Sequence, residues 1–208
     1  VLPIGEYNMV YWGINNPQDT MILEESVRSP SYSVGSDMIN QTWNLQPYTY
    51  GDTLYHPVYD LAYTTKQVSI GAENIAVPLQ RAVSAIQVTL NVAPGQTFDS
   101  SIDTIFAYVG NIANELNFCT AAPSDFTKTI RFPLTIAADR KSAQSYITMV
   151  FPSAPDPLFT IRIFLKNGEE KKGLSYIVYK VTAPARYIKW IGWRSTWEHY
   201  IGKVIKRR

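Results

Sequence analysis

With 208 residues, the chain is long enough for one or two domains with their own hydrophobic cores. Charged residues make up 17% and aromatic residues 13%, and the 14 tyrosines favour half-buried strand positions. The single cysteine, Cys119, excludes an intrachain disulfide, and no apolar run reaches the roughly 18 residues of a transmembrane helix.

The first third of the chain predicts short strands separated by polar connections. It opens on the turn-forming segment 3–5 without an initiating Met or a basic leader, so we expect a fragment that has lost an N-terminal signal and the first strands. Tyr7–Trp12 is a clear strand, whereas Ser36–Asp60 is expected to be a long connection because prolines and glycines interrupt it. Shorter strands are expected at Met21–Leu23, Tyr32–Val34, Thr53–Tyr55 and Gln67–Ile70.

From residue 66 to residue 181 the apolar residues recur with the period of two that is typical of half-buried strands. Val77–Val92 changes phase near Ser84 and Ala85, which indicates a bulge or kink. A hairpin is expected from the strands 158–165 and 174–181, closed by Asn167-Gly168. Further strands are expected at Ile102–Val109, Thr129–Ile136 and Ser145–Phe151.

This pattern predicts an all-β fold with a β-sandwich spanning about 77–181. We place a domain boundary near residues 73–77. Residues 1–76 are then the C-terminal part of a first sandwich domain, 77–182 a second sandwich domain, and 183–208 a tail. The predicted core of the second domain consists of Ile86, Val88, Leu90, Ile105, Phe132, Leu134, Ile147, Met149, Phe151, Ile161 and Ile163.

The tail differs in composition from the rest of the chain. Residues 183–208 carry seven Lys or Arg against one acidic residue, a net charge of +6, while the other residues sum to −4. A helical period gathers Trp190, Trp193, Trp197 and Ile201 on one face, which predicts a basic amphipathic helix that faces a membrane or caps a sheet edge. Two alternatives are a tail that is not native to the fold and a nucleic-acid contact. The acidic body and the missing binding-fold signature weigh against nucleic acid as a partner.

Residues that usually indicate an enzyme are scarce. The two histidines lie in unrelated segments, and no nucleophile elbow, phosphate-binding loop or dinucleotide fingerprint is present. We interpret His56 as a loop residue and Cys119 as a small, half-buried hydrophobe. Three histidines and cysteines in total are too few and too separated for a zinc site, so no metal, cofactor or catalytic residue is assigned. Carboxylate pairs that could by type serve glycoside hydrolysis are Glu24-Glu25, Asp99 with Asp103, and Glu169-Glu170.

Several segments resemble the fimbrillin-like domains of the Bacteroidales. The resemblance covers roughly residues 1–181, in the family's order and spacing. Its motifs are Leu2–Trp12, Val77–Val88, Val109–Phe118, Ile130–Leu134, Thr148–Pro152, and Leu158–Ile163 with Lys166–Gly168.

The family comprises fimbrial subunits and cell-surface anchor lipoproteins. The resemblance implies two transthyretin-like Greek-key sandwich domains, export to the outer membrane, lipid attachment at an N-terminal cysteine and assembly by strand exchange. This chain departs from the pattern in two respects. It carries no lipid-attachment motif, and its tail after Thr182 is expected to lack the final strand of the family.

We therefore expect a non-catalytic fimbrial component or anchor subunit at the cell surface. It would join partner subunits by β-strand addition and contribute to adhesion to a host or glycan ligand. The alternative is a carbohydrate-binding accessory lipoprotein of the outer membrane. For either role, the expected ligand or partner surface is Trp12, Trp43, Tyr48 and Tyr50.

Overall fold

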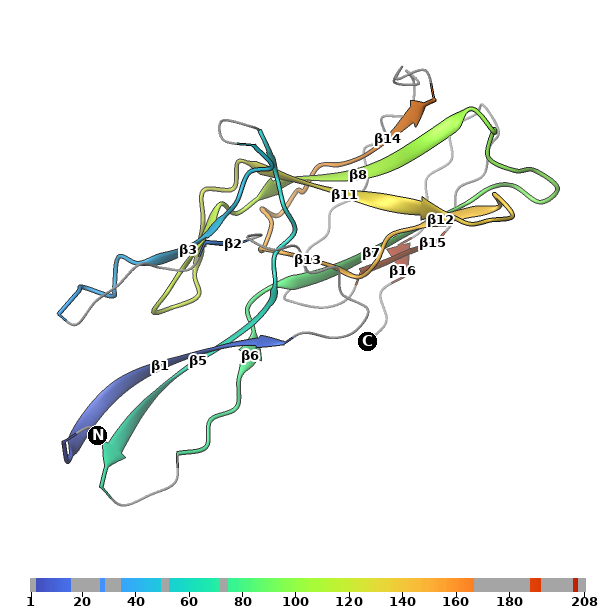
Figure 1. The fold of residues 1–208 in the computed structure, drawn as a ribbon. Coiled ribbons are helices and arrows are strands. Elements are labelled where there is room, and N and C mark those ends of the chain that lie inside the picture. The colour runs from blue at the N-terminus through green and yellow to red at the C-terminus, as the bar shows by residue number, and fades with distance from the viewer. Residues whose placement is uncertain are drawn as a thin grey trace.

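A computed structural model describes residues 3–15, 27–28, 35–49, 53–71, 75–166, 188–191 and 204–205. These residues form sixteen strands (Figure 1). The strands are β1 (Gly5–Asn15), β2 (Val27–Arg28), β3 (Thr42–Leu45), β4 (Leu54–Tyr55), β5 (Asp60–Ile70), β6 (Gln80–Arg81), β7 (Ser84–Asn91), β8 (Ile102–Ile112), β9 (Glu115–Asn117), β10 (Pro123–Ser124), β11 (Lys128–Ile136), β12 (Ser142–Gln144), β13 (Thr148–Val150), β14 (Phe159–Leu165), β15 (Ile188–Ile191) and β16 (Val204–Ile205).

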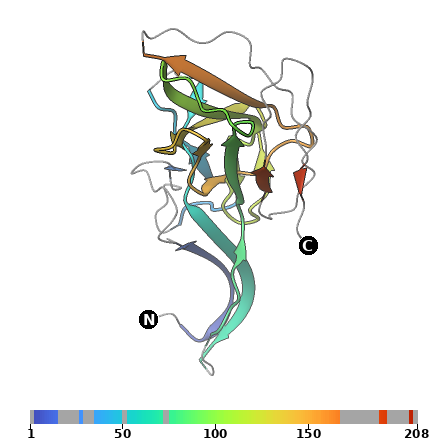
Figure 2. The same cartoon turned by 90° about the vertical axis from the view of Figure 1, so that its right-hand side faces the viewer.

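The strands belong to three sheets. The largest runs in the order β14-β8-β11-β12-β7-β15-β16, with β13 also on β7 and β4 on β11, and the second runs β10-β9-β3-β2. The third consists of β1 and β5 with a short β6. We call the pair β1 and β5 the ribbon and the remaining strands the body. The ribbon projects away from the body in both views (Figures 1 and 2).

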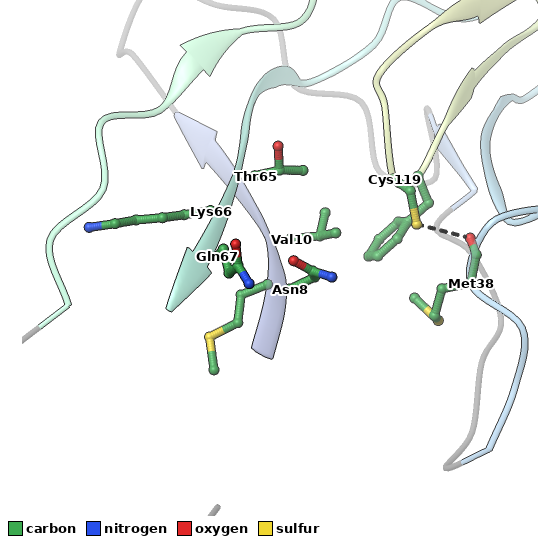
Figure 3. Close-up of a pocket in the computed structure, with 9 residues that line it drawn as sticks. Asn8, Val10, Met38, Thr65, Lys66, Gln67 and Cys119 are labelled. Atoms are coloured by element: carbon green, nitrogen blue, oxygen red, sulfur yellow. Dashed lines mark hydrogen bonds between the residues drawn. The ribbon is translucent and has the colours of Figure 1, made fainter. Parts of the chain in front are cut away.

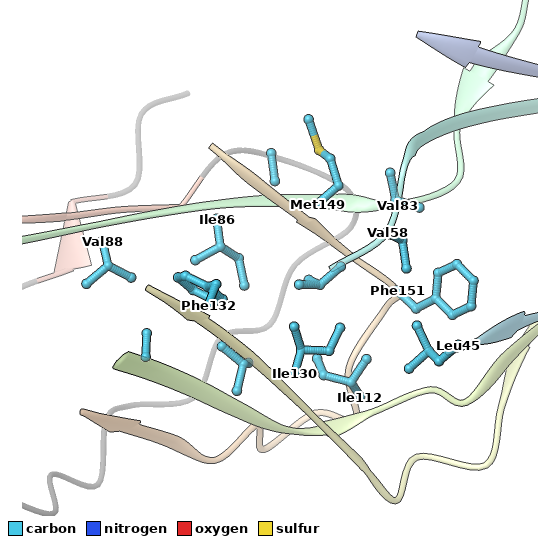
Figure 4. Packing of buried hydrophobic residues seen from close by; sticks show 14 of the residues in the cluster. Leu45, Val58, Val83, Ile86, Val88, Ile112, Ile130, Phe132, Met149 and Phe151 are labelled. Atoms are coloured by element: carbon cyan, nitrogen blue, oxygen red, sulfur yellow. The ribbon is translucent and has the colours of Figure 1, made fainter. Parts of the chain in front are cut away.

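The prediction of an all-β sandwich is confirmed, and so is its predicted core. In Figure 4, Ile86 and Val88 of β7 face Ile130 and Phe132 of β11 across the interior. Leu90 and Ile147 are the two predicted core residues that are only half-buried, and both pack against the cluster. The predicted core residues that are buried are Ile86, Val88, Ile105, Phe132, Leu134, Met149, Phe151, Ile161 and Ile163.

The predicted kink before Ala85 marks a change of sheet. The chain leaves β6 at Arg81 and enters β7 at Ser84, and β6 pairs with β5 whereas β7 pairs with β12 and β13. The Arg81 guanidinium donates to both carboxylate oxygens of Asp60, at 2.7 and 2.8 Å. Because Asp60 is only 2% exposed, this bidentate pair fixes the base of the ribbon where the chain enters the body.

The long connection predicted at Ser36–Asp60 contains more structure than expected. A strand is present at Leu54–Tyr55, as predicted, but β3 at Thr42–Leu45 was not predicted. Trp43 and Leu45 are buried while Thr42 and Asn44 are half-buried, and β3 pairs with β9. A segment of only four residues between polar neighbours shows too little periodicity to predict a strand. Its pairing partner, β9, lies some seventy residues away and is not recognisable from the sequence.

The helix predicted for the tail is wrong at the residues that the structure describes there. Ile188–Ile191 forms β15, which pairs in parallel with β7, and β16 pairs with β15. The edge of β7 offers unpaired backbone groups with which an extended segment can form hydrogen bonds. This pairing is more favourable than an amphipathic helix, which Gly192 already destabilises. The expectation that the tail lacks a strand is corrected too. Trp193, Trp197 and Ile201 lie outside the described residues.

The predicted hairpin is described only in its first arm. β14 is present at Phe159–Leu165 and pairs antiparallel with β8, while the turn and the arm at 174–181 lie outside the described residues. The domain boundary near residues 73–77 stays a prediction. Val58 and Leu61 precede that boundary, and they pack in the same hydrophobic cluster as Val83 and Phe132, which follow it.

Phe132→Ala should lower the free energy of unfolding by about 3–5 kcal/mol, since the ring is 1% exposed and its removal leaves a cavity. Urea denaturation followed by circular dichroism measures the change. Leu158→Ala is the control, because Leu158 is 58% exposed and its loss should change the stability little. Equal losses for both variants would contradict the assigned core.

Candidate functional site

The ribbon is a long antiparallel pair whose β1 edge has no strand partner along its whole length among the described residues. β1 and β5 pair over eleven residues without a register shift, from Gly5 opposite Ile70 to Asn15 opposite Asp60. β6 covers the far side of β5 only at Ala62 and Tyr63. Within the described residues, β1 is the outermost strand of this sheet, so its outward-facing backbone groups have no strand partner there.

An aromatic junction joins the ribbon to the body. It consists of Trp12, Tyr63, Trp43 and Phe118. The Trp12 ring centroid lies 4.9 Å from that of Tyr63, 5.4 Å from that of Trp43 and 6.0 Å from that of Phe118. Two hydrogen bonds complete it. The Trp12 Nε1–H donates to the Phe118 carbonyl at 2.9 Å, and the Tyr63 hydroxyl donates to the Cys119 carbonyl.

The junction follows from strand register. Trp12 and Tyr63 are directly opposite residues of β1 and β5, so their side chains lie on the same face of the ribbon. Trp43 of β3 and Phe118, which follows β9, come from the neighbouring sheet of the body. The offset and tilted ring pairs are favourable aromatic geometries. Sequence reasoning missed Tyr63 and Phe118, because only the pairing register brings them to Trp12.

Beyond the junction, the ribbon and the body enclose a cleft of about 690 Å³. On the ribbon side the lining residues are Asn8, Met9, Val10, Thr65, Lys66 and Gln67. Asn8 and Val10 point toward Met38 and Cys119 of the body in Figure 3. The body side includes Met38, Phe118 and Cys119. The Cys119 thiol donates to the Met38 carbonyl at 3.3 Å, so this cysteine contributes to packing, as the sequence predicts.

Tyr48 belongs to a different cluster. Its ring centroid lies 3.8 Å from that of His56, and the Arg131 guanidinium lies 4.2 Å above the Tyr48 ring and 5.1 Å from Phe106. The Tyr48 hydroxyl donates to the Arg131 carbonyl at 2.8 Å. Burial raises the pKa of Tyr48 despite the nearby arginine. Burial also lowers the pKa of His56, and the charge of Arg131 lowers it further.

The predicted ligand surface is therefore split. The structure brings Trp12 and Trp43 together, and Trp43 is only 8% exposed. Tyr48 makes its contacts with His56 and Arg131, and Tyr50 lies outside the described residues. Whether any of these residues bind a ligand stays a prediction. Trp12, Trp43 and Tyr48 share one feature: each places its aromatic side chain at a contact between elements.

The catalytic candidates are dispersed in the part of the chain that is described. There, no three His, Cys, Asp or Glu side chains gather where they could hold a metal ion. An oxygen of Asp99 accepts a hydrogen bond from the Ser101 amide at 2.7 Å, which is a turn-forming contact. Glu24-Glu25 and Glu169-Glu170 lie outside the described residues. No helix long and apolar enough to span a bilayer occurs among the described residues.

A family model described as Fimbrillin-A associated anchor proteins Mfa1 and Mfa2 matches residues 1–190. No curated protein matches the chain. Among solved structures, the chain is similar to a candidate polysaccharide-binding protein from Bacteroides thetaiotaomicron, at 13% identity and a TM-score of 0.56. That match covers 91% of this chain and 71% of the other.

Two candidate adhesins from Bacteroides ovatus are also similar. One has 9% identity and a TM-score of 0.54, and the match covers 82% of this chain and 64% of the adhesin. The other has 12% identity and the same TM-score, with 91% and 69% covered. At these identities the similarity concerns the fold alone. This chain thus spans less than two thirds of the length of the first adhesin.

Trp12→Ala should release the ribbon from the body. The substitution removes three ring contacts and the hydrogen bond to the Phe118 carbonyl. Because the ring is partly buried, we expect the free energy of unfolding to fall by about 2–4 kcal/mol. Hydrogen exchange with mass spectrometry should show faster exchange across β1 and β5 than across β8. Trp12→Phe keeps ring packing and should lose about 1 kcal/mol. Unchanged exchange in the ribbon of the Ala variant would show that the junction does not hold it.

The lowered pKa of His56 predicts a pH dependence of stability. Because the folded state disfavours the charged imidazole, the unfolded state binds more protons below the ordinary pKa of 6.5. Stability should therefore fall as the pH drops from 7.5 through about 6.5 toward 5. Urea denaturation of the wild type and of His56→Gln measures this, with His199 common to both. An identical pH profile for the two proteins would be inconsistent with a perturbed His56.

Proposed function

Because the chain belongs to the family of fimbrillin-A associated anchor proteins, we propose that it is a non-catalytic, fimbria-associated component of the cell surface that binds partner subunits by β-strand addition. The observation that carries the proposal is the eleven-residue outer edge of β1. A cell-surface location at the outer membrane and a contribution to adhesion follow from the family and are part of the same proposal.

The physical basis is hydrogen bonding at the edge of a sheet. In an antiparallel pair, alternate residues direct their backbone N–H and C=O groups away from the partner strand. On β1 these groups point outward, where an extended segment of another chain can accept and donate hydrogen bonds at the usual strand spacing of about 4.8 Å. Each added residue pair then satisfies backbone groups that water would otherwise solvate.

β1 also lacks the features by which edge strands usually avoid such pairing. Proteins protect edges with prolines, lysines, bulges or short strands. Between Gly5 and Asn15 the sequence has no proline and no lysine, and Glu6 is its only charged residue. The register with β5 runs without a bulge. A long, regular and nearly uncharged edge favours strand addition.

Side chains on either face of the ribbon would supply selectivity. Tyr7, Met9 and Tyr11 lie on one face of β1, while Asn8 and Val10 lie on the other face, toward the cleft. Met9 also contributes to the lining of the cleft. An added strand with apolar residues at alternate positions would extend the face formed by Tyr7, Met9 and Tyr11. Its other side chains would point toward the cleft. This binding mode requires no catalytic group.

Site-specific photo-crosslinking tests the proposal. A photoreactive amino acid is placed at Asn8 of β1, or as a matched control at Gln67, the exposed residue directly opposite on β5. The full-length protein is expressed in the source bacterium and illuminated, and its adducts are identified by mass spectrometry. An added strand would lie about 4.8 Å from β1 and twice as far from β5.

We expect fimbrial subunits to be crosslinked from position 8 through an extended segment, with a much lower yield from position 67. Equal yields from both positions, or no fimbrial adduct from position 8, would refute strand addition at β1. If a photoreactive residue elsewhere on the surface gives fimbrial adducts and position 8 does not, the anchor role is supported but the partner binds at a site other than β1.

A further inference from the structure

A bulge interrupts the strand that pairs with β7 on the side of β12. Gln144 lies opposite Thr89, and Thr148, the next paired residue, lies opposite Ile86. The three residues 145–147 therefore face only two residues of β7, Gln87 and Val88. One extra residue in a strand turns a side chain outward at that point and makes a local bend, which is the usual effect of a β-bulge.

Ser145 holds this bulge in one conformation. The side chain is 3% exposed, and its Oγ accepts a hydrogen bond from the Val88 amide at 3.0 Å. The Ser145 amide donates to the Val88 carbonyl at 2.9 Å, so one residue occupies both backbone groups of Val88. The Ser145 hydroxyl and the Thr148 hydroxyl both donate to the Tyr146 carbonyl, at 2.8 and 3.2 Å.

The backbone at Tyr146 is thereby held in place, and the side chain projects from it. Its backbone carbonyl is held by two hydroxyls, yet the residue is 56% exposed. An exposed aromatic ring on a backbone that is held in this way is suited to stacking against a flat, partly apolar ligand.

A pocket of about 430 Å³ adjoins Tyr146, within the range of about 300–1,000 Å³ usual for small-molecule sites. Gln87, Gln144, Thr135 and Ser142 supply two amides and two hydroxyls to its lining, and none of the described lining residues is charged. None of these four side chains forms a hydrogen bond within the part of the chain that is described. They are available to a ligand as both donors and acceptors.

We propose that this pocket is a binding site for a neutral saccharide. Sugar hydroxyls both donate and accept hydrogen bonds, which matches amides and hydroxyls, and the C–H face of a pyranose can stack on the Tyr146 ring. Among the described residues of the lining, an acidic saccharide would find no arginine or lysine to offset the loss of its hydration. The site lies on the body at β7, β11 and β12, not at the buried Trp43 for which a sugar platform was expected, and it is independent of strand addition at β1.

Affinity electrophoresis of the purified chain tests this site. Native gels contain dextran, yeast mannan or laminarin as neutral polysaccharides, and alginate or heparin as acidic ones. We expect retardation by at least one neutral polysaccharide. Because residues 183–208 carry a net charge of +6, alginate or heparin can also retard the chain, but that retardation should be the same for the wild type and Tyr146→Ala. For the neutral polysaccharide, Tyr146→Ala should raise the dissociation constant about tenfold, whereas Tyr146→Phe should keep it within about twofold, since the ring face and not the hydroxyl is used.

Two further variants separate binding from folding. Gln144→Ala alters an exposed amide of the pocket without touching the bulge, and it should also weaken retardation. Phe126→Ala removes a partly exposed aromatic residue (37%) elsewhere and should have no effect. The proposal is overturned if no neutral polysaccharide retards the chain, if retardation by alginate or heparin depends on Tyr146 as strongly as retardation by the neutral polysaccharide, or if both pocket variants bind like the wild type.

Discussion

The indole of Trp12 is the contact on which the arrangement of ribbon and body depends. It packs against Tyr63 within the ribbon and against Trp43 and Phe118 of the body, and its N–H is bonded to the Phe118 carbonyl. A two-stranded ribbon is marginally stable by itself in water. These contacts at one end, with the Asp60–Arg81 ion pair beside them, hold it while the outer edge of β1 stays without a strand partner among the described residues.

In the body, too, the residues that pack the interior are different from those that face solvent. Its interior is filled by the inward residues of β7, β8, β11 and β14, so a substitution there affects the whole fold. At the bulge before Thr148, buried hydroxyls fix the backbone while the neighbouring side chain faces solvent. The groups that are available for binding therefore lie on elements that the core and a few buried polar contacts hold rigid. Rigid elements lose less conformational entropy when a ligand or partner binds.

The predictable parts of the fold are the strands in which apolar and polar residues alternate along the sequence. Ile161 and Ile163 alternate with Thr160 and Arg162, and both isoleucines are buried as expected. β3 was missed because its partner β9 is remote in sequence, and the tail was predicted as a helix because periodicity does not reveal an open edge of β7. Of the candidate site, Trp12 was identified, but Tyr63, Phe118 and Tyr146 depend on register and on a bulge, which only pairing in space defines.

The most direct test of strand addition is residue-resolved amide exchange by NMR along β1, with and without purified fimbrial subunits of the source bacterium. In the free chain, amides that point to β5 should be protected and the alternate, outward-facing amides should exchange rapidly. Binding by strand addition should slow exchange at the outward-facing amides and leave the protected ones unchanged. Binding of the subunits with no change in that alternating pattern between Gly5 and Asn15 would contradict docking at the edge of β1.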